Sequence, residues 1–440
     1  MRPFYYSDPM GKDFDRVALV VMDGVGCGEA EDAHAEYPQD TGANSLVNAS
    51  RFQRIHAPAL QNIGLEYIPG LQGKISVALP TLWANVRGAL GALSPTFAGN
   101  GSPEGHQALT GHRVATPYLL FNKTGFPPEL VNRIEEAAEK AAGRPVRVIR
   151  YPGTDDINGE KFFNHPAIGE VHYSSKDPKN PLFVPIYASS DSLVQVALHV
   201  DVMPLSMMEA ICQAIRTEAL DGEFKNVARV ILRPWGGEPG KFERLSQHRK
   251  DFGIDPDGPT IVDHMASKGM PVFAVGKAGE MLNGRGFDHD RIMKGDSDKA
   301  RIEEVARLMG EGQGPAFIFA NLKDTDEKSG HTRKPSLYSQ HVETASRGIG
   351  EVMGRMGERD LLIVTADHGT DPTNTAHTNH TRENVPLLVF TPGLVRPVEL
   401  GIRSTYADVA ATIAEAMGIE QHVHEGTSFL KEVLDGRRPK

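Results

Sequence analysis

The stretch that decides the fold runs from Leu361 to Pro386 and reads LLIVTADHGTDPTNTAHTNHTRENVP. It opens with an apolar run long enough for a buried strand, and Asp367 and His368 follow that run directly. In an open α/β sheet, ligands bind beyond the carboxyl ends of the strands. A carboxylate and an imidazole on a rigid strand end are suitable ligands for a divalent metal ion. His380 is a third candidate ligand, although these residues alone would also fit a polar turn and a surface histidine.

Two more predicted strands end in residues of the same kind. The apolar run Val17–Met22 is followed by Asp23, and the run Pro315–Asn321 leads to a loop that carries Asp326 and His331. Continuous apolar runs are typical of central parallel strands, which are buried on both faces. An aspartate that caps the following helix is the alternative for the first site. Three such strand ends in one chain favour metal binding over three unrelated turns.

A glycine-rich stretch, Ala98–Arg113, contains a candidate nucleophile. Gly99, Gly101 and Gly105 surround Ser102, so the pattern predicts a loop that exposes the hydroxyl. Backbone N–H groups in such a loop are free to bind an anion. A plain surface loop is the alternative.

The predicted ligands divide into two sites. We expect one site to consist of Asp326, His331 and His380, and the other of Asp23, Asp367 and His368 with Ser102 beside it. Two divalent ions close together activate a nucleophile and stabilise both oxygens of an in-line phosphoryl displacement. A metal-bound Ser102 would lose its proton more readily and would then act as the nucleophile.

Length and composition bound the remaining possibilities. A chain of 440 residues is too long for one compact core. The pattern of predicted helices, strands and loops changes along the chain, and it predicts an inserted α+β domain at 117–257 within a core formed by 1–116 and 258–440. The net charge of −10 and the lack of a long apolar run argue against nucleic-acid and membrane partners. The two cysteines, Cys27 and Cys212, lie far apart, and the N-terminus shows no signal-peptide pattern, so a cytoplasmic location is expected.

The inserted domain carries arginine and serine/aspartate clusters. Arg233 and Arg249 lie within it, as does the run that contains Ser189 and Asp191. Guanidinium groups bind phosphate in a bidentate manner, so these residues are candidates for holding a phosphorylated small-molecule substrate. A solvated charged face is the alternative.

The chain resembles the phosphopentomutase family of the alkaline-phosphatase superfamily, which also includes cofactor-independent phosphoglycerate mutase. The motifs that carry the resemblance are Val21–Gly26, Thr41–Leu46, Ser102–His106, Tyr187–Leu193, Arg233–Gly240, Val275–Lys277, Asp326–His331, Thr365–Gly369 and Asn379–Glu383. The resemblance implies an alkaline-phosphatase-like α/β core, with a mostly parallel sheet and helices on both faces, and an inserted cap. It also implies two divalent ions held by the residues grouped above, typically manganese, with zinc or magnesium as alternatives.

The same resemblance implies roles for single residues. Ser102 would carry the phosphoryl group, in a position where phosphopentomutases have threonine. Residues that would approach the sugar phosphate are Ser189, Asp191, Arg233 and Arg249. We therefore expect a two-metal phosphomutase that interconverts ribose or deoxyribose 1-phosphate and the 5-phosphate. The alternatives are a metal-dependent phosphatase or phosphonate hydrolase, a mutase for another phosphorylated small molecule, and a metal-binding protein without catalytic activity.

Overall fold

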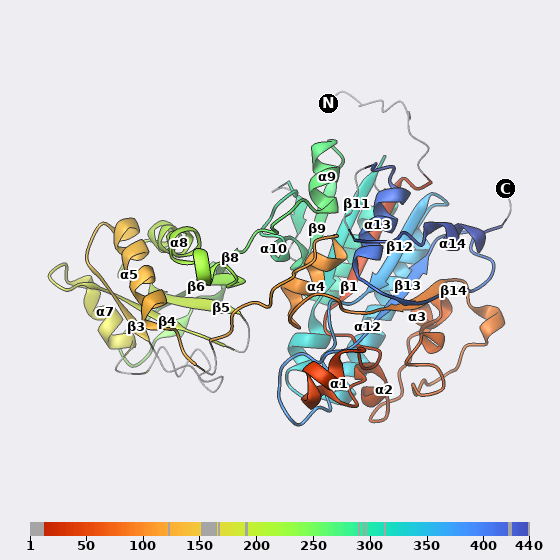
Figure 1. The fold of residues 1–440 in the computed structure, drawn as a ribbon, viewed down its shortest axis with the longest axis horizontal. Coiled ribbons are helices and arrows are strands. Elements are labelled where there is room, and N and C mark those ends of the chain that lie inside the picture. The colour runs from red at the N-terminus through yellow and green to blue at the C-terminus, as the bar shows by residue number, and fades with distance from the viewer. Residues whose placement is uncertain are drawn as a thin grey trace. The chain divides into compact units, whose positions relative to one another are not determined.

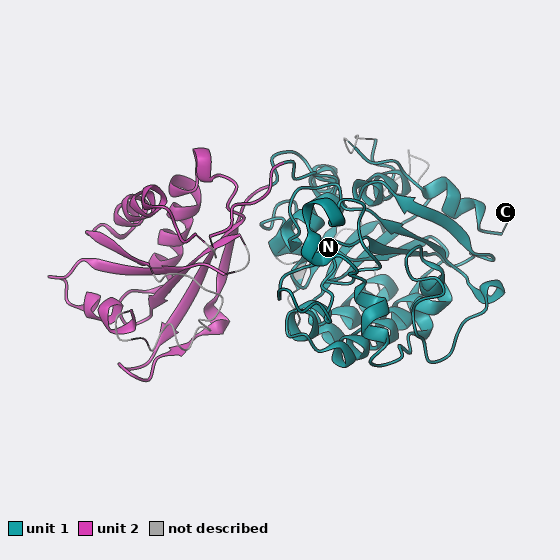
Figure 2. Cartoon of the chain, turned by 60° about the horizontal axis from the view of Figure 1, so that its bottom comes forward, with its two compact units in different colours: residues 1–115, 256–440 teal, residues 116–255 magenta. Residues whose placement is uncertain are grey.

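A computed structural model of the protein describes residues 13–121, 124–150, 165, 168–189, 192–288, 291–293, 295, 297–311, 314–420 and 425–438. The chain forms two compact units, which Figure 2 distinguishes by colour. Unit 1 combines residues 1–115 with 256–440, and unit 2 consists of residues 116–255. No helix in these described ranges is both long and apolar enough to cross a membrane.

Unit 1 is built on an eight-stranded sheet (Figure 1). In spatial order its strands are β10 (Ile292–Met293), β9 (Val272–Val275), β11 (Ala316–Leu322), β1 (Arg16–Met22), β12 (Asp360–Thr365), β13 (Val385–Phe390), β2 (Ala89–Leu93) and β14 (Val398–Arg403). All neighbouring strands are parallel except those that pair with β13, which runs antiparallel to both β12 and β2. The three central strands β11, β1 and β12 are almost entirely buried, as their apolar runs predict.

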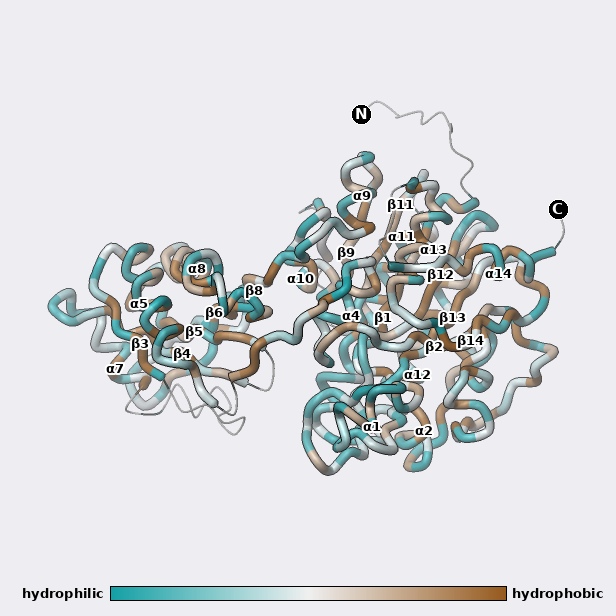
Figure 3. Tube along the Cα trace, viewed as in Figure 1, coloured by the Kyte–Doolittle hydropathy of each residue, from teal (hydrophilic) through white to brown (hydrophobic). Residues whose placement is uncertain are grey.

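Helices cover both faces of this sheet, and the helices within each group pack against one another (Figure 1). One group consists of α2 (Ser45–Ser50), α3 (Pro58–Ile63), α11 (Asp298–Glu311) and α12 (Pro335–Arg355). The other consists of α4 (Ser102–Leu109), α9 (Ile261–Ser267), α10 (Ala278–Met281), α13 (Ala407–Ala416) and α14 (Leu430–Asp435). Figure 3 shows hydrophobic residues gathered on the strands and hydrophilic ones on the surrounding segments. The predicted α/β core with a mostly parallel sheet is confirmed.

The direction of the strands brings distant segments to one edge of the sheet. Strands β1, β11, β12 and β2 all end at this edge, because they run in the same direction. Strand β13 runs the other way, so it begins there, with Val385 opposite Leu93 at the end of β2. The residues just before β13 therefore lie at the same edge as the residues just after the other strands.

The glycine-rich stretch differs from the sequence prediction. A helix, α4, begins at Ser102, with Gly101 as its N-cap and Pro103 in the first turn, so the prediction of a loop throughout Ala98–Arg113 was wrong. Residues 104–109 of this helix are all buried. Proline is favourable in the first turn, and tertiary packing stabilises short helices whose intrinsic propensity is low.

Unit 2 has a mixed sheet and its own hydrophobic core, as an α+β arrangement requires. Its strands are β3 (Val146–Arg150), β4 (Leu182–Tyr187), β5 (Leu193–His199), β6 (Arg229–Gly236), β7 (Glu243–Arg244) and β8 (Lys250–Gly253). Helices α5 (Pro128–Ala142) and α8 (Leu205–Ala214) pack together and contribute to that core.

The two chain segments that connect unit 2 to the rest of the chain are fixed to the same short stretch of backbone. The amide of Leu119, near the start of unit 2, donates a hydrogen bond to the Asn226 carbonyl at 2.9 Å. The amide of Ile254, near its end, donates to the Ala228 carbonyl at 2.8 Å. The start and the end of unit 2 are therefore close to each other.

Candidate metal centre

One predicted ligand set, Asp23, Asp367 and His368, forms a buried cluster at the edge of the main sheet. His368 Nε2 lies 3.5 Å from Asp23 Oδ1 and 3.3 Å from Asp367 Oδ2. Both carboxylate oxygens are buried; beside them lie His368 Nε2 and, 3.2 Å from Asp367 Oδ2, His106 Nδ1. Buried carboxylates that only imidazole nitrogens approach are poorly compensated, so a cation bound between these oxygens would stabilise both. Oxygen and imidazole ligands suit a divalent transition-metal ion.

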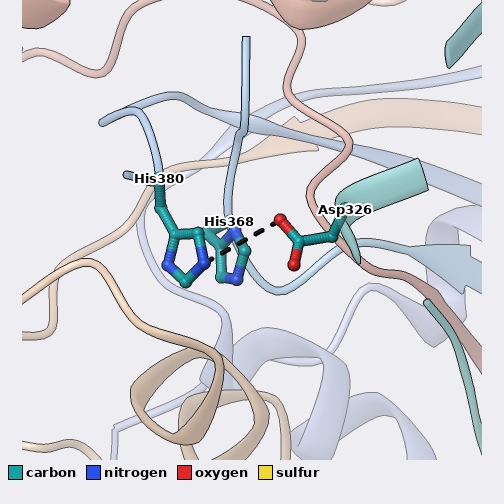
Figure 4. Close-up of side chains that lie close together, drawn as sticks. All are labelled: Asp326, His368 and His380. Carbon is teal, nitrogen blue, oxygen red and sulfur yellow. Dashed lines mark ion pairs between the residues drawn. The ribbon is translucent and has the colours of Figure 1, made fainter. Parts of the chain in front are cut away.

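The second predicted set, Asp326, His331 and His380, lies directly beside the first. His331 Nε2 is 3.2 Å from Asp326 Oδ2 and 3.1 Å from His380 Nε2, and His380 Nε2 is 3.8 Å from Asp326 Oδ1. The rings of His368 and His380 are stacked with their centroids 3.6 Å apart, and Asp326 faces them (Figure 4). Potential ligand atoms of Asp326, His368 and His380 lie within 4.8 Å of one another. The two sets thus form one continuous centre, with His368 next to both.

The strand directions explain how these residues meet. Asp23 follows β1, and Asp367 and His368 follow β12. Asp326 lies in a helical turn, Thr325–Gly330, that follows β11. His380 precedes the reversed strand β13, which places it at the same edge.

Electrostatics within the centre reflect its burial. Burial raises the pKa of Asp23 well above its usual value, and the neighbouring carboxylates of Asp367 and Asp326 raise it further. Burial also acts to raise the pKa of Asp326, but the nearby histidines, His331 and His380 above all, lower it well below its usual value. Three carboxylates packed this closely repel one another, and a divalent cation would remove that repulsion.

Ser102 lies at the first residue of α4, with its Oγ 3.0 Å from His368 Nε2. The N-terminus of a helix favours negative charge, as an alkoxide or a phosphoryl group would carry. The helix reaches this position because residue 105 is glycine. A Cβ at Gly105 would lie 2.8 Å from the carbonyl carbon and the Cβ of Asp367, and closer still to the carbonyl oxygen.

Arg382 and Arg333 fix the loops around the metal centre. The sequence alone does not identify either residue as functional. Arg382 is 3% exposed and forms a salt bridge with Asp32. It also donates hydrogen bonds to the backbone carbonyls of Pro95, Phe97 and Gly99 in the segment before α4. Arg333 donates to the carbonyls of Gly330, Asp371, His377 and Asn379. These two side chains tie the loop that carries His380 to the segments that carry Ser102 and Asp326.

The predicted substrate residues belong to unit 2. Arg233 Nε donates to Gln195 Oε1 at 2.8 Å, and Arg249 forms a bidentate pair with Asp251 at 2.7 and 2.6 Å. Burial, with the charge of Arg249 next in importance, lowers the pKa of Arg233 to about 10. Ser189 lies two residues after β4, whereas Asp191 lies outside the described residues.

Comparisons with known proteins identify the family. A family model described as Metalloenzyme superfamily matches residues 282–421. Phosphopentomutase of Caldanaerobacter subterraneus subsp. tengcongensis is 37% identical over 418 residues, which cover 95% of this chain and 98% of the relative. Phosphopentomutase of Thermotoga maritima is 34% identical over 415 residues, which cover 94% and 98%. The chain belongs to the phosphopentomutase family.

Membership of the phosphopentomutase family makes the protein a metal-dependent phosphomutase, so the predicted family and enzyme class are confirmed.

Solved structures give weaker matches. The PH0037 protein from Pyrococcus horikoshii is 14% identical with a TM-score of 0.46, over 93% of this chain and 99% of that one. Phosphoglycerate mutase of Leishmania mexicana is 14% identical with a TM-score of 0.39, over 96% and 98%.

Proposed function

We propose that the protein interconverts ribose or deoxyribose 1-phosphate and the corresponding 5-phosphate through a phosphorylated Ser102. The observation that carries this proposal is the position of Ser102 at the N-terminus of α4, with its Oγ 3.0 Å from His368 Nε2. Next to it lie the buried carboxylate oxygens of Asp23 and Asp367. The relatives are phosphopentomutases, which supports a pentose phosphate as substrate.

We propose two divalent ions, preferably manganese, as the cofactor. Asp326, His331 and His380 would hold one ion, and Asp23, Asp367, His368 and Ser102 would hold the other. When bound, the ions supply positive charge to a deprotonated hydroxyl and to the phosphoryl oxygens. Mixed imidazole and carboxylate ligation suits manganese or zinc better than calcium. Elemental analysis should find two ions per chain in active protein, and one ion or none would contradict the two-site arrangement.

The residues of this chain would act in two phosphoryl transfers. In the first, the bond between Ser102 Oγ and phosphorus breaks while the free hydroxyl of the sugar phosphate forms a new bond to phosphorus, giving a bisphosphate. In the second, Ser102 Oγ takes the phosphoryl group from the other end of the sugar. The proton that the sugar hydroxyl loses in the first transfer is balanced by the proton that the departing sugar oxygen gains in the second.

We propose that unit 2 binds the substrate through Ser189, Asp191, Arg233 and Arg249. Support comes from the charges of Arg249 and Arg244, which add to burial in lowering the pKa of Arg233, because a phosphate group between the guanidinium groups would offset their repulsion. A cytoplasmic location would suit Cys27 and Cys212, which are both buried free thiols.

The decisive experiment incubates manganese-loaded enzyme with ribose 5-phosphate and separates ribose 1-phosphate from free phosphate. A mutase yields the isomer, whereas predominant release of phosphate would indicate a hydrolase. Ser102→Ala should fold and bind metal, yet lose several orders of magnitude in turnover, because the hydroxyl that accepts the phosphoryl group is removed. Ser102→Thr keeps the hydroxyl and should retain appreciable activity. Mass spectrometry after exposure to a sugar bisphosphate should find one phosphoryl group on the peptide that contains Ser102, and a phosphoryl group elsewhere would contradict the mechanism.

A further inference from the structure

His106 is fully buried and connects α4 to two carboxylates of the metal centre. Its Nδ1 lies 2.9 Å from the carbonyl oxygen of Ser102 and 3.2 Å from Asp367 Oδ2. On the other side of the ring, Nε2 lies 3.1 Å from Nδ2 of Asn321. Asn321 Nδ2 in turn donates a hydrogen bond to Asp23 Oδ2 at 3.0 Å. A chain of polar contacts thus joins the candidate nucleophile to Asp23 and Asp367.

The contacts of Asn321 determine which nitrogen of the His106 ring carries the proton. Its Nδ2 can only donate, and it faces both the Asp23 carboxylate and His106 Nε2. Asn321 Oδ1 is buried and has no hydrogen-bond partner among the described residues, so turning the amide over would leave its N–H donors buried without an acceptor. His106 Nε2 must therefore accept a hydrogen bond, which leaves Nδ1 as the nitrogen that donates. Nδ1–H donates to the Ser102 carbonyl, with Asp367 Oδ2 on the same side.

We propose that His106, as the Nδ1–H tautomer, is a positioning residue that sets the distance between Ser102 and the ligand set of Asp23 and Asp367. Its ring is held in place by Phe319 of β11, with ring centroids 5.7 Å apart. Hydrogen bonds of this kind, made by residues behind the ligands, orient the ligands and tune metal affinity. The kinetic part of this inference rests on the proposed role of Ser102, whereas the tautomer and the effect on metal affinity do not.

Two substitutions distinguish the contribution of His106 Nδ1 from that of Nε2. His106→Asn keeps an N–H donor near the position of Nδ1, and His106→Gln keeps a polar atom near Nε2 but lacks the Nδ1 donor. We expect kcat to fall by about 10–100-fold in His106→Gln and by clearly less in His106→Asn. If His106 only filled space, kcat would fall more in His106→Asn than in His106→Gln, because glutamine is closer to histidine in volume. Equal losses in both variants, or the reverse order, would overturn the proposal.

Metal binding provides a readout that does not depend on turnover. Titration of the metal-free protein with Mn²⁺ in a calorimeter should show about tenfold weaker binding in His106→Gln than in wild type. The matched control is His172→Phe, because His172 is also fully buried but lies in unit 2, where its Nδ1 contacts the Phe183 carbonyl. This control should leave Mn²⁺ affinity unchanged. Unaltered affinity in His106→Gln, or an equal loss in the control, would remove the link to the metal centre.

The tautomer can be measured in the wild-type protein, so the proposal stays testable even if the variants fail to fold. Selective ¹⁵N labelling of histidine in the Mg²⁺-loaded protein should show, for His106, a protonated Nδ1 and an unprotonated Nε2. A protonated Nε2 would overturn the proposal. Activity in Ser102→Ala would refute the proposed nucleophile but would leave this spectrum and the metal titration unaffected, so the two failures can be told apart.

Discussion

Gly105→Ala tests how closely α4 must approach Asp367. The added Cβ would lie 2.8 Å from the carbonyl carbon and the Cβ of Asp367, whereas ordinary contacts begin at 3.4 Å, so the helix and the strand end must separate by at least about 0.6 Å. The carbonyl oxygen is closer still, which brings the required displacement to about 1 Å. Overpacking of this kind destabilises a fold by about 1–3 kcal/mol.

The same displacement moves Ser102 away from the centre, because both residues belong to one short helix. A misplacement of about 1 Å at a reacting group reduces the rate by about 100-fold. We therefore expect kcat for ribose 5-phosphate to fall by about two orders of magnitude in Gly105→Ala, while KM changes little. The assay compares steady-state kinetics with urea unfolding of the same preparation.

Gly354→Ala is the matched control. Gly354 lies near the end of α12, is exposed, and has no atom within 4 Å of an added Cβ. Alanine favours a helix over glycine by up to about 1 kcal/mol, so this variant should be slightly more stable than wild type and equally active. A kcat within twofold of wild type in Gly105→Ala, or equal losses in both variants, would refute the reasoning from close approach.

Three further predictions test other parts of the structure. Arg233→Ala and Arg249→Ala should each raise KM while metal affinity stays constant, since a charge-assisted hydrogen bond to phosphate contributes about 1.5–3 kcal/mol; normal saturation in both would contradict their role. Burial, together with the charge of Asp371, raises the pKa of Glu383 from 4.5 to about 7. Between these two pH values the folded protein binds a proton that the unfolded chain has lost, so wild type should become less stable relative to Glu383→Gln as the pH rises. Urea unfolding at about pH 5 and about pH 8 measures the difference in free energy of unfolding between the two proteins, and the same difference at both pH values would refute this prediction. A chelator should lower the melting temperature in calorimetry, since ions present at a hundred times their Kd contribute about 2.7 kcal/mol; an unchanged value would argue against bound metal.

The parts of the fold that the sequence predicted are those with continuous apolar runs. Strands β1, β11 and β12 are buried on both faces, so their sequences contain little besides apolar residues, and their ends are marked by Asp23, Asp326 and Asp367. Local pattern is sufficient there, because burial on both faces excludes polar residues from the strand and leaves them at its end.

Other features depend on contacts between distant residues. The apolar run of β13 gives no sign of its direction, which is set by pairing with β12 and β2. Helix α4 is short and contains glycine and proline, so packing decides its conformation. The contact between His106 and Asn321 joins residues 215 positions apart, and a single sequence holds no record of such a pairing.

Because the two ends of unit 2 lie close together, this unit can be inserted into or removed from a protein chain as one piece. Leu119 and Ile254 are both bonded to residues 226–228, so a gene segment encoding this unit could enter or leave a host protein without stretching the backbone of either. The same geometry makes residues 116–255 a candidate for independent production, since they carry their own core cluster. Joining residues 115 and 256 with a short linker would show whether unit 1 folds and binds metal without unit 2.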